Sequence, residues 1–233
     1  MCGILVTAGF SGAFHHRQLK SLRKRGPDEI GFWSNESVKM AHTRLAIIGL
    51  DDRSTEPMEN DAYVLVYNGE VYNFLDIKDR LAREGIILTA ANDAEVLLHA
   101  WTLWGPKILT EIAGFWAFVL YDKSRNKLTL VRDQLGIKPL YYWHSNGGVC
   151  VSSMIGTILN VVGQSRELDY AAISEYVRYQ FTFGDKTLLN RLKKFSPGTL
   201  SKSLLILMKY QQHVTKTFWL LLQKKRQNLR LNG

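Results

Sequence analysis

Cys2 directly follows the initiator methionine, so removal of Met1 would make a cysteine the first residue of the chain. A terminal cysteine carries two reactive groups. Its thiol is a strong nucleophile once deprotonated, and its α-amine, whose pKa is ordinarily about 7.7–8.0, can take up the thiol proton near neutral pH. The alternative is an ordinary second-position cysteine without a chemical role. Cys2 is therefore a candidate nucleophile that needs no histidine partner.

Asn68 and Gly69 could supply a second part of such chemistry. They follow an apolar, strand-like run at residues 63–67. At a sharp turn, the Asn68 side-chain amide and the Gly69 N–H can both donate a hydrogen bond to one developing oxyanion. The competing interpretation is a two-residue hairpin turn, for which Asn-Gly is the strongest short-range signal. Both interpretations place a turn after residue 67.

Arg44 and Asp93 are candidate binding residues of opposite charge. Arg44 lies in the strand-like run 41–48, where its planar guanidinium could hold a carboxylate through two parallel hydrogen bonds or form a structural salt bridge. Asp93 begins a helix, where it could favour the helix dipole or bind an ammonium group. A thiol nucleophile, an oxyanion site, a carboxylate clamp and an acid for an ammonium describe a site for an amino acid with a reactive side-chain carbonyl. Glutamine is the obvious candidate.

Hydrophobic periodicity indicates which elements position these residues. Short helices are expected within residues 15–25 and at 74–84, 154–161 and 169–179, and a further helix begins at Asn92, with Glu95 at the capping-box position. Strands are expected at residues 4–10, 30–33, 38–43, 63–67, 115–121, 127–132, 140–143 and 149–152. Many strands with a few helices predict an α+β domain with antiparallel sheets over residues 2–185.

Charge is distributed unevenly along the 233 residues. The net charge is +9, but residues 186–233 hold 11 Lys and Arg and no acid, so the first 185 residues are nearly neutral. The basic end could bind nucleic acid or an anionic membrane. It could also be a poorly structured extension, which we expect for residues 199–233. No nucleic-acid or membrane partner is therefore expected.

Several other classes are also disfavoured. Apolar runs fall short of the ~18 residues that cross a bilayer, and two cysteines cannot form a disulfide framework. The start of the chain lacks the basic and apolar regions of a secretory signal, so a cytoplasmic location is expected. Six scattered histidines without a cysteine cluster predict no metal site. The absence of a Gly-rich phosphate loop predicts no cofactor.

Six motifs occur in one order along the chain: Met-Cys-Gly-Ile at residues 1–4, Arg-Gly-Pro-Asp at 25–28, His-Thr-Arg-Leu-Ala-Ile-Ile at 42–48, Tyr-Asn-Gly-Glu-Val-Tyr-Asn at 67–73, Asn-Asp-Ala-Glu at 92–95 and Arg-Asp-Gln-Leu-Gly-Ile-Lys-Pro-Leu-Tyr-Tyr at 132–142. Over residues 1–198 the chain resembles the glutaminase domain of glutamine-hydrolysing asparagine synthetases, a class II glutamine amidotransferase with the N-terminal nucleophile hydrolase fold. The resemblance implies a four-layer αββα sandwich.

The resemblance also implies roles for the motif residues. Cys2 resembles the nucleophile, with its free amine as the base, and would release ammonia from glutamine through a glutamyl thioester that water hydrolyses to glutamate. The other implied residues are the oxyanion hole of Asn68 and Gly69, Arg44 on the glutamine α-carboxylate, Glu70 and Asp93 on its α-amine, and the pocket-lining stretch of Leu45, Ile47 and Ile48.

The family normally continues into an ATP-dependent synthetase domain with a Ser-Gly-Gly-x-Asp-Ser loop, which this sequence lacks. Residues 186–198 resemble the start of the linker toward that domain, and residues 199–233 resemble no part of the pattern. A glutaminase that passes ammonia to a separate synthetase subunit, for asparagine or a related amide, is expected. The alternative is a non-catalytic or truncated remnant that serves as a partner subunit or is an inert product.

Overall fold

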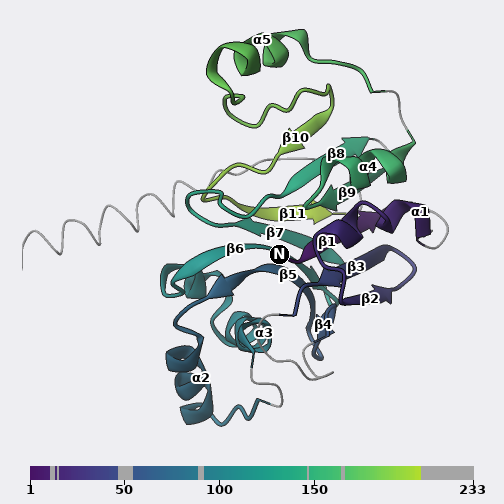
Figure 1. The fold of residues 1–233 in the computed structure, drawn as a ribbon. Coiled ribbons are helices and arrows are strands. Elements are labelled where there is room, and N and C mark those ends of the chain that lie inside the picture. The colour runs from purple at the N-terminus through teal and green to yellow at the C-terminus, as the bar shows by residue number, and fades with distance from the viewer. Residues whose placement is uncertain are drawn as a thin grey trace, which may run out of the picture.

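Two antiparallel β-sheets form the centre of the computed structural model, which describes residues 1–205 except 11–13, 15, 47–54, 89–91, 146 and 164–165. Sheet A runs in the order β10 (Leu192–Lys194), β8 (Tyr141–Ser145), β9 (Gly148–Ser152), β1 (Gly3–Ala8), β3 (Val38–Arg44) and β2 (Glu29–Ser34). Sheet B runs in the order β11 (Leu200–Leu205), β7 (Lys127–Arg132), β6 (Gly114–Asp122), β5 (Tyr63–Val71) and β4 (Met58–Glu59). Figure 1 shows the two sheets stacked on one another.

The core between the sheets is built from alternate residues of the central strands. Ile4 and Val6 of β1 face Val64 and Val66 of β5 in one buried apolar cluster. Leu5, between them in sequence, points the other way and packs in a second cluster beneath helices. Because sheet A is covered on both faces, β1 is buried along its whole length, and its sequence is apolar except for Thr7.

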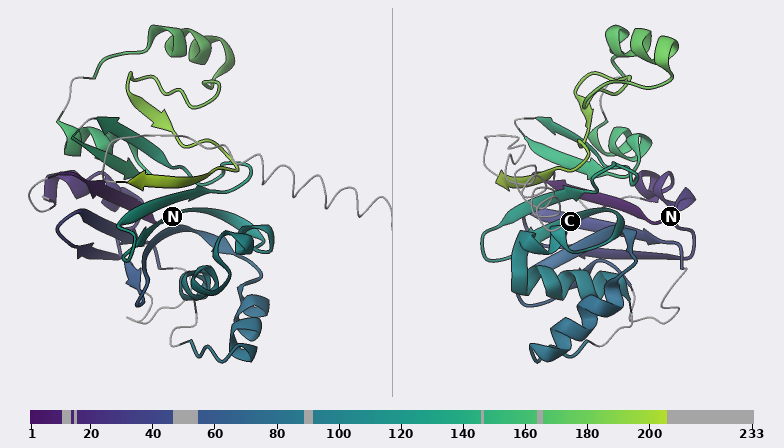
Figure 2. Two further views of the ribbon diagram at one scale, coloured as in Figure 1. Left: turned by 180° about the vertical axis from the view of Figure 1, so that it is seen from behind. Right: turned by 90° about the vertical axis from the view of Figure 1, so that its left-hand side faces the viewer.

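Helices complete two outer layers (Figure 2). The outer face of sheet B is covered by α2 (Phe74–Arg83), α3 (Asp93–Trp104) and the 3-10 helix η3 (Gly105–Thr110). The outer face of sheet A is covered by α1 (His16–Leu19), the 3-10 helix η1 (Leu22–Lys24) and α4 (Ile155–Val162), whereas α5 (Tyr170–Tyr179) lies away from both sheets. The predicted α+β class with an αββα sandwich is confirmed.

The prediction of a turn after residue 67 is wrong. Strand β5 runs from Tyr63 to Val71, straight through Asn68 and Gly69, because β6 pairs with it along all nine positions, including Gly69 opposite Trp116. The continuous ladder of a long partner strand outweighs the local preference of Asn-Gly for a hairpin turn. Asn68 and Gly69 are therefore held by a rigid strand.

The sheets also reach beyond residue 185, where the sequence predicted the end of the domain. Strand β10 pairs with β8 in sheet A, and β11 pairs with β7 in sheet B. The expectation of poor structure from residue 199 onward does not hold for Leu200–Leu205, which form β11. Residues 206–233, the rest of the predicted basic tail, lie outside the described residues.

Candidate active site

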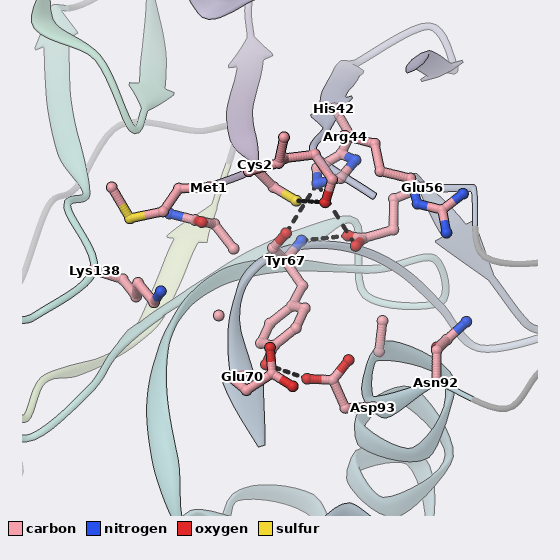
Figure 3. Close-up of a pocket in the computed structure, with 14 residues that line it drawn as sticks. Met1, Cys2, His42, Arg44, Glu56, Tyr67, Glu70, Asn92, Asp93 and Lys138 are labelled. Carbon is pink, nitrogen blue, oxygen red and sulfur yellow. Dashed lines mark hydrogen bonds and ion pairs between the residues drawn. The ribbon is translucent and has the colours of Figure 1, made fainter. Parts of the chain in front are cut away.

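Six segments of the sandwich meet at one cavity of about 110 Å³ (Figure 3). They are the start of β1, the end of β3, the residue Glu56 just before β4, strand β5, the first turn of α3 and the loop after β7. Its described lining includes Met1, Cys2, His42, Arg44, Leu45, Glu56, Tyr67, Asn68, Gly69, Glu70, Asn92, Asp93, Ala94 and Lys138. The cavity thus gathers seven of the nine residues that the sequence singled out. Ile47 and Ile48 lie outside the described residues.

Cys2 is positioned by one contact to its thiol and one to its carbonyl oxygen. Its thiol lies 3.9 Å from the Leu45 carbonyl oxygen, and Arg25 Nε donates a hydrogen bond of 3.0 Å to its carbonyl oxygen. Burial raises the pKa of the Cys2 thiol above its ordinary value, and the nearby Glu56 carboxyl acts in the same direction. In a chain that still carries Met1, Cys2 is therefore held in place but is a weak nucleophile, because its thiol stays protonated.

The Arg-Gly-Pro-Asp motif braces the backbone around the nucleophile. Besides the Arg25 contact, the Asp28 carboxylate accepts a 2.8 Å hydrogen bond from the Ala46 N–H, and the Asp28 N–H donates to the Arg44 carbonyl at 3.1 Å. Gly26 is required here because a Cβ would lie 2.3 Å from the Thr43 carbonyl oxygen. The motif thus ties the end of β3 to the start of β1.

Asn68 faces the cavity with an unused donor. Its side chain is 1% exposed, and its Nδ2 atom has no hydrogen-bond partner among the described residues. Such a buried orphan donor is rare, because an unsatisfied amide costs about 1–3 kcal/mol. A substrate oxygen placed beside Nδ2 would remove that cost, so the arrangement suits an oxyanion site.

The Gly69 N–H points to the same edge of β5 as the N–H groups of Tyr67 and Val71, which already donate hydrogen bonds to side chains. The Asn60 N–H bonds to the Tyr63 carbonyl on this edge, where β4 lies, and alternate residues of a strand face the same edge. The Tyr67 N–H donates to Glu56 at 2.5 Å, and the Val71 N–H donates to Asp93 at 2.9 Å. Gly69 lies between Tyr67 and Val71, so its N–H faces the same edge of β5 as theirs.

Arg44 carries the positive charge at the end of β3. Its Nη1 atom lies 3.3 Å from a carboxylate oxygen of Glu29, and its side chain is 10% exposed. Thr55 donates a 2.5 Å hydrogen bond to the other carboxylate oxygen of Glu29. Arg44 is thus fixed in direction by a structural ion pair while it lines the cavity.

Two carboxyl groups line the cavity, Asp93 from the first turn of α3 and Glu70 from β5. Asp93 accepts hydrogen bonds from the Tyr67 hydroxyl at 2.7 Å and the Val71 N–H at 2.9 Å. Burial raises the pKa of Asp93, and burial together with the charge of Asp93 raises the pKa of Glu70. Acids destabilised in this way favour a cation between them, so this side of the cavity suits an ammonium group.

Asn92 lines the cavity as the N-cap of α3, as the sequence predicted for that position. Its Oδ1 atom accepts a 2.8 Å hydrogen bond from the Glu95 N–H. The cap fixes where the helix begins and so fixes the direction of the neighbouring Asp93.

Among the lining residues that sequence reasoning did not single out, three matter most for the site: His42, Lys138 and Glu56. His42 precedes Arg44 by two positions on β3, a spacing that puts both on one face and could have revealed it. Lys138 lies in the last motif, in a loop whose N–H groups at residues 135, 137 and 138 converge on the buried Asp133 carboxylate. Glu56 lies in a polar stretch of sequence without hydrophobic periodicity, and no signal in the sequence marks it.

Among the residues that the structure describes, no cluster of histidine, cysteine or acidic side chains could hold a metal ion. In the same part of the chain no helix has the length and apolar character needed to cross a membrane.

Comparison with known proteins agrees with this geometry. A family model described as a glutamine amidotransferase domain matches residues 1–219. Asparagine synthetase [glutamine-hydrolyzing] 3 of Bacillus subtilis is 33% identical over 185 residues, which covers 75% of this chain and 30% of the relative. Asparagine synthetase [glutamine-hydrolyzing] 1 of the same organism is 32% identical over 177 residues, with 75% and 28% covered. The chain thus spans less than a third of the length of either relative.

A solved structure shows the same fold at low identity. The glutamine phosphoribosylpyrophosphate amidotransferase of B. subtilis superposes with a TM-score of 0.60 at 20% identity, over 72% of this chain and 45% of that chain. The two chains therefore share the fold of the αββα sandwich. With the family match over nearly its whole length, the chain belongs to the glutamine amidotransferase domain family and is similar to the glutamine-hydrolysing asparagine synthetases.

Proposed function

We propose that this chain, once Met1 is removed, hydrolyses the side-chain amide of glutamine with Cys2 as the nucleophile. The observation that carries the proposal is that the Cys2 thiol, the orphan Asn68 amide and the carboxyl groups of Glu70 and Asp93 line one cavity. A nucleophile, an oxyanion donor and an ammonium site are what glutamine hydrolysis requires.

The reaction begins with proton transfer within one residue. The freed α-amine of Cys2 takes the thiol proton, and the thiolate attacks the amide carbon of glutamine. The carbonyl oxygen becomes an oxyanion that accepts hydrogen bonds from Asn68 Nδ2 and the Gly69 N–H. The amine returns its proton to the amide nitrogen, the carbon–nitrogen bond breaks, and ammonia leaves a glutamyl thioester. Water then attacks the thioester and the carbon–sulfur bond breaks, so that glutamate is released and the sulfur regains a proton from the water as the Cys2 thiol.

The two ends of the cavity orient the substrate. Arg44 binds the glutamine α-carboxylate through its guanidinium group, and Leu45 lines the pocket beside the thiol. Glu70 and Asp93 bind the α-ammonium group. Ile47 and Ile48 extend this pocket wall in the proposal. An amino acid that lacks either charged group should bind poorly, which favours glutamine over simple amides.

The ammonia serves an amide-forming synthetase in this proposal. The relatives named as glutamine-hydrolysing asparagine synthetases are more than three times as long as the part that this chain matches. A separate polypeptide that accepts ammonia, for asparagine or a related amide, would supply the remaining step.

The test is glutamate release from glutamine by purified protein whose intact mass confirms the loss of Met1. The Cys2→Ala variant should lose activity entirely, whereas Cys150→Ala should retain it, because Cys150 is fully buried and burial strongly raises its pKa. An electrophilic diazo-ketone analogue of glutamine should alkylate Cys2 alone. Full activity in protein that retains Met1, or labelling of Cys150 alone, would overturn the proposal.

A further inference from the structure

Beside the oxyanion donors, the edge of β5 has no strand paired with it in the described part of the chain. Strand β4 pairs Met58 with Leu65, and the next position along the same edge would set residue 56 opposite Tyr67. No backbone bond is formed there. Instead the Glu56 side chain accepts the Tyr67 N–H at 2.5 Å, and His42 Nε2 lies 3.0 Å from the Tyr67 carbonyl oxygen. Two side chains thus replace the ladder bonds of a missing strand (Figure 3).

These two side chains come from different parts of the sandwich. His42 belongs to β3 of sheet A and is 1% exposed, and Glu56 lies two residues before β4 and is 6% exposed. Glu56 Oε1 lies 3.6 Å from His42 Nε2, so the two groups lie side by side over one peptide. They clamp β5 of sheet B to sheet A at Tyr67.

Burial disfavours the charged form of both side chains. Burial lowers the pKa of His42 to about 4 and raises that of Glu56 well above its ordinary value. A neutral imidazole whose Nε2 faces a carbonyl oxygen donates its Nε2–H to that oxygen. The contacts at Tyr67 are therefore ordinary hydrogen bonds, which a neutral amide side chain could imitate.

The clamp acts one residue before the oxyanion donors. Tyr67 precedes Asn68, and beyond Gly69 the Val71 N–H is fixed by Asp93. We propose that Glu56 and His42 are positioning residues that hold the Tyr67 peptide, and through it Asn68 Nδ2 and the Gly69 N–H, at the place where the oxyanion forms. This inference rests on the proposed glutaminase function. Because the donors matter most in the transition state, loss of the clamp should lower kcat and leave KM nearly unchanged.

The first test compares two substitutions of similar size. Glu56→Gln keeps an oxygen that accepts the Tyr67 N–H and should stay within about threefold of the wild-type kcat. Glu56→Met has no acceptor and should lower kcat by about a hundredfold, the range for a misplaced or missing oxyanion donor. Glu59→Gln is the matched control, because Glu59 is half-exposed on β4 and contacts Trp33 and Lys123. Its kcat should equal that of the wild type. A folded Glu56→Gln variant with kcat lowered more than about tenfold, or an unaffected Glu56→Met variant, would overturn the inference.

A double-mutant cycle separates positioning from general loss of structure. If Glu56 acts through the oxyanion donors, Glu56→Met should lower kcat by a smaller factor in an Asn68→Ala background than in the wild type, because only the Gly69 N–H is then left to be misplaced. Independent effects that multiply would contradict the inference.

Amide hydrogen exchange gives a readout that does not depend on turnover. The peptide that spans Tyr67 and Gly69 should exchange faster in Glu56→Met than in Glu56→Gln or Glu59→Gln, while peptides from β9 stay unchanged. Equal exchange in all variants would overturn the clamp. If the clamp is found by exchange but the wild type releases no glutamate, the proposed function fails and the positioning of β5 stands.

Discussion

An orphan amide lies in the same cavity as the half-buried Cys2 thiol, and this amide lowers stability unless a ligand uses it. Asn68 Nδ2 has no partner among the described residues, although its side chain is almost completely buried. A buried asparagine with a purely structural role normally has its side-chain amide hydrogen-bonded. The cost is consistent with a donor kept ready for a ligand oxygen, since binding sites commonly trade stability for function.

Replacement of Asn68 by alanine should separate activity from stability. Loss of one oxyanion donor is expected to lower kcat about 10²–10³-fold. The free energy of unfolding should change by less than about 1 kcal/mol, because the lost packing is offset by removal of an unsatisfied buried amide. Glutamate release and urea denaturation measure the two quantities on the same preparation. A variant with normal kcat, or one destabilised by several kcal/mol, would show that the Asn68 amide is structural.

His42 should make stability depend on pH in a defined window. Its pKa is lowered by burial from 6.5 to about 4, so between these values the unfolded chain binds more protons than the folded one. Stability therefore falls as the pH is lowered through this window, by about 3 kcal/mol in total. Urea denaturation of the wild type and His42→Gln at several pH values should show this loss only in the wild type. The outcome against it is a parallel decline in both proteins.

Residue identities at the site could be predicted where a motif carried them. Cys2, Arg44, Leu45, Asn68, Gly69, Glu70 and Asp93 all line the cavity, although they come from distant positions in the chain. Glu56 could not be predicted, because its role depends on where β4 begins and on a contact with a peptide eleven residues away. Neither spacing nor residue type reports such a tertiary relation.

At the scale of elements, the site depends on how closely two segments approach. Gly31 of β2 faces the segment that carries Glu56, and a Cβ at Gly31 would lie 1.9 Å from the Glu56 carbonyl oxygen. Since that oxygen belongs to the backbone, no side-chain rotation can relieve the clash. The glycine is therefore what lets Glu56 reach the edge of β5.

Gly31→Ala should displace the Glu56 segment and weaken both stability and turnover. Overpacking of this kind ordinarily costs about 1–3 kcal/mol, and the loss of the Tyr67 contact should lower kcat as well. Gly156→Ala is a matched control, because it lies in α4, where the nearest atom to an added Cβ is 4.0 Å away. Thermal unfolding and glutamate release are measured for both. Identical behaviour of the two alanine variants would contradict the proposed close approach.

Elements were predicted well where periodicity decided them and poorly where long-range pairing did. The first strand and the helix beginning at Asp93 follow from their apolar patterns, and the Asn92 cap is confirmed. The turn at Asn68-Gly69 was wrong, because local turn preference does not report a partner strand some 45 residues later.

At the scale of the whole molecule, residues 192–205 contribute one strand to each sheet. Strands β10 and β11 are edge strands, and the segment between them supports the loop after β7. The Phe195 carbonyl accepts a 2.5 Å hydrogen bond from Arg132, and the Gly198 N–H donates to the Asp133 carbonyl at 2.8 Å. These contacts connect residues past 185 to the loop that carries Lys138 into the cavity.

Truncation should therefore reveal where the folding unit ends. A chain that ends at Leu205 keeps β11 and should unfold cooperatively. A chain that ends at Gly198 exposes the β7 edge and the apolar surface that Leu200 covers, so it should lose at least about 2 kcal/mol and tend to aggregate. A chain that ends at residue 185, the domain boundary predicted from the expected strands and helices, also loses β10 and the supports of Arg132 and Asp133, and should not fold stably. Urea denaturation and size-exclusion chromatography of the three chains give the order. Equal stability of the chains ending at 185 and at Leu205 would show that β10 and β11 are appended to a sandwich that is complete without them.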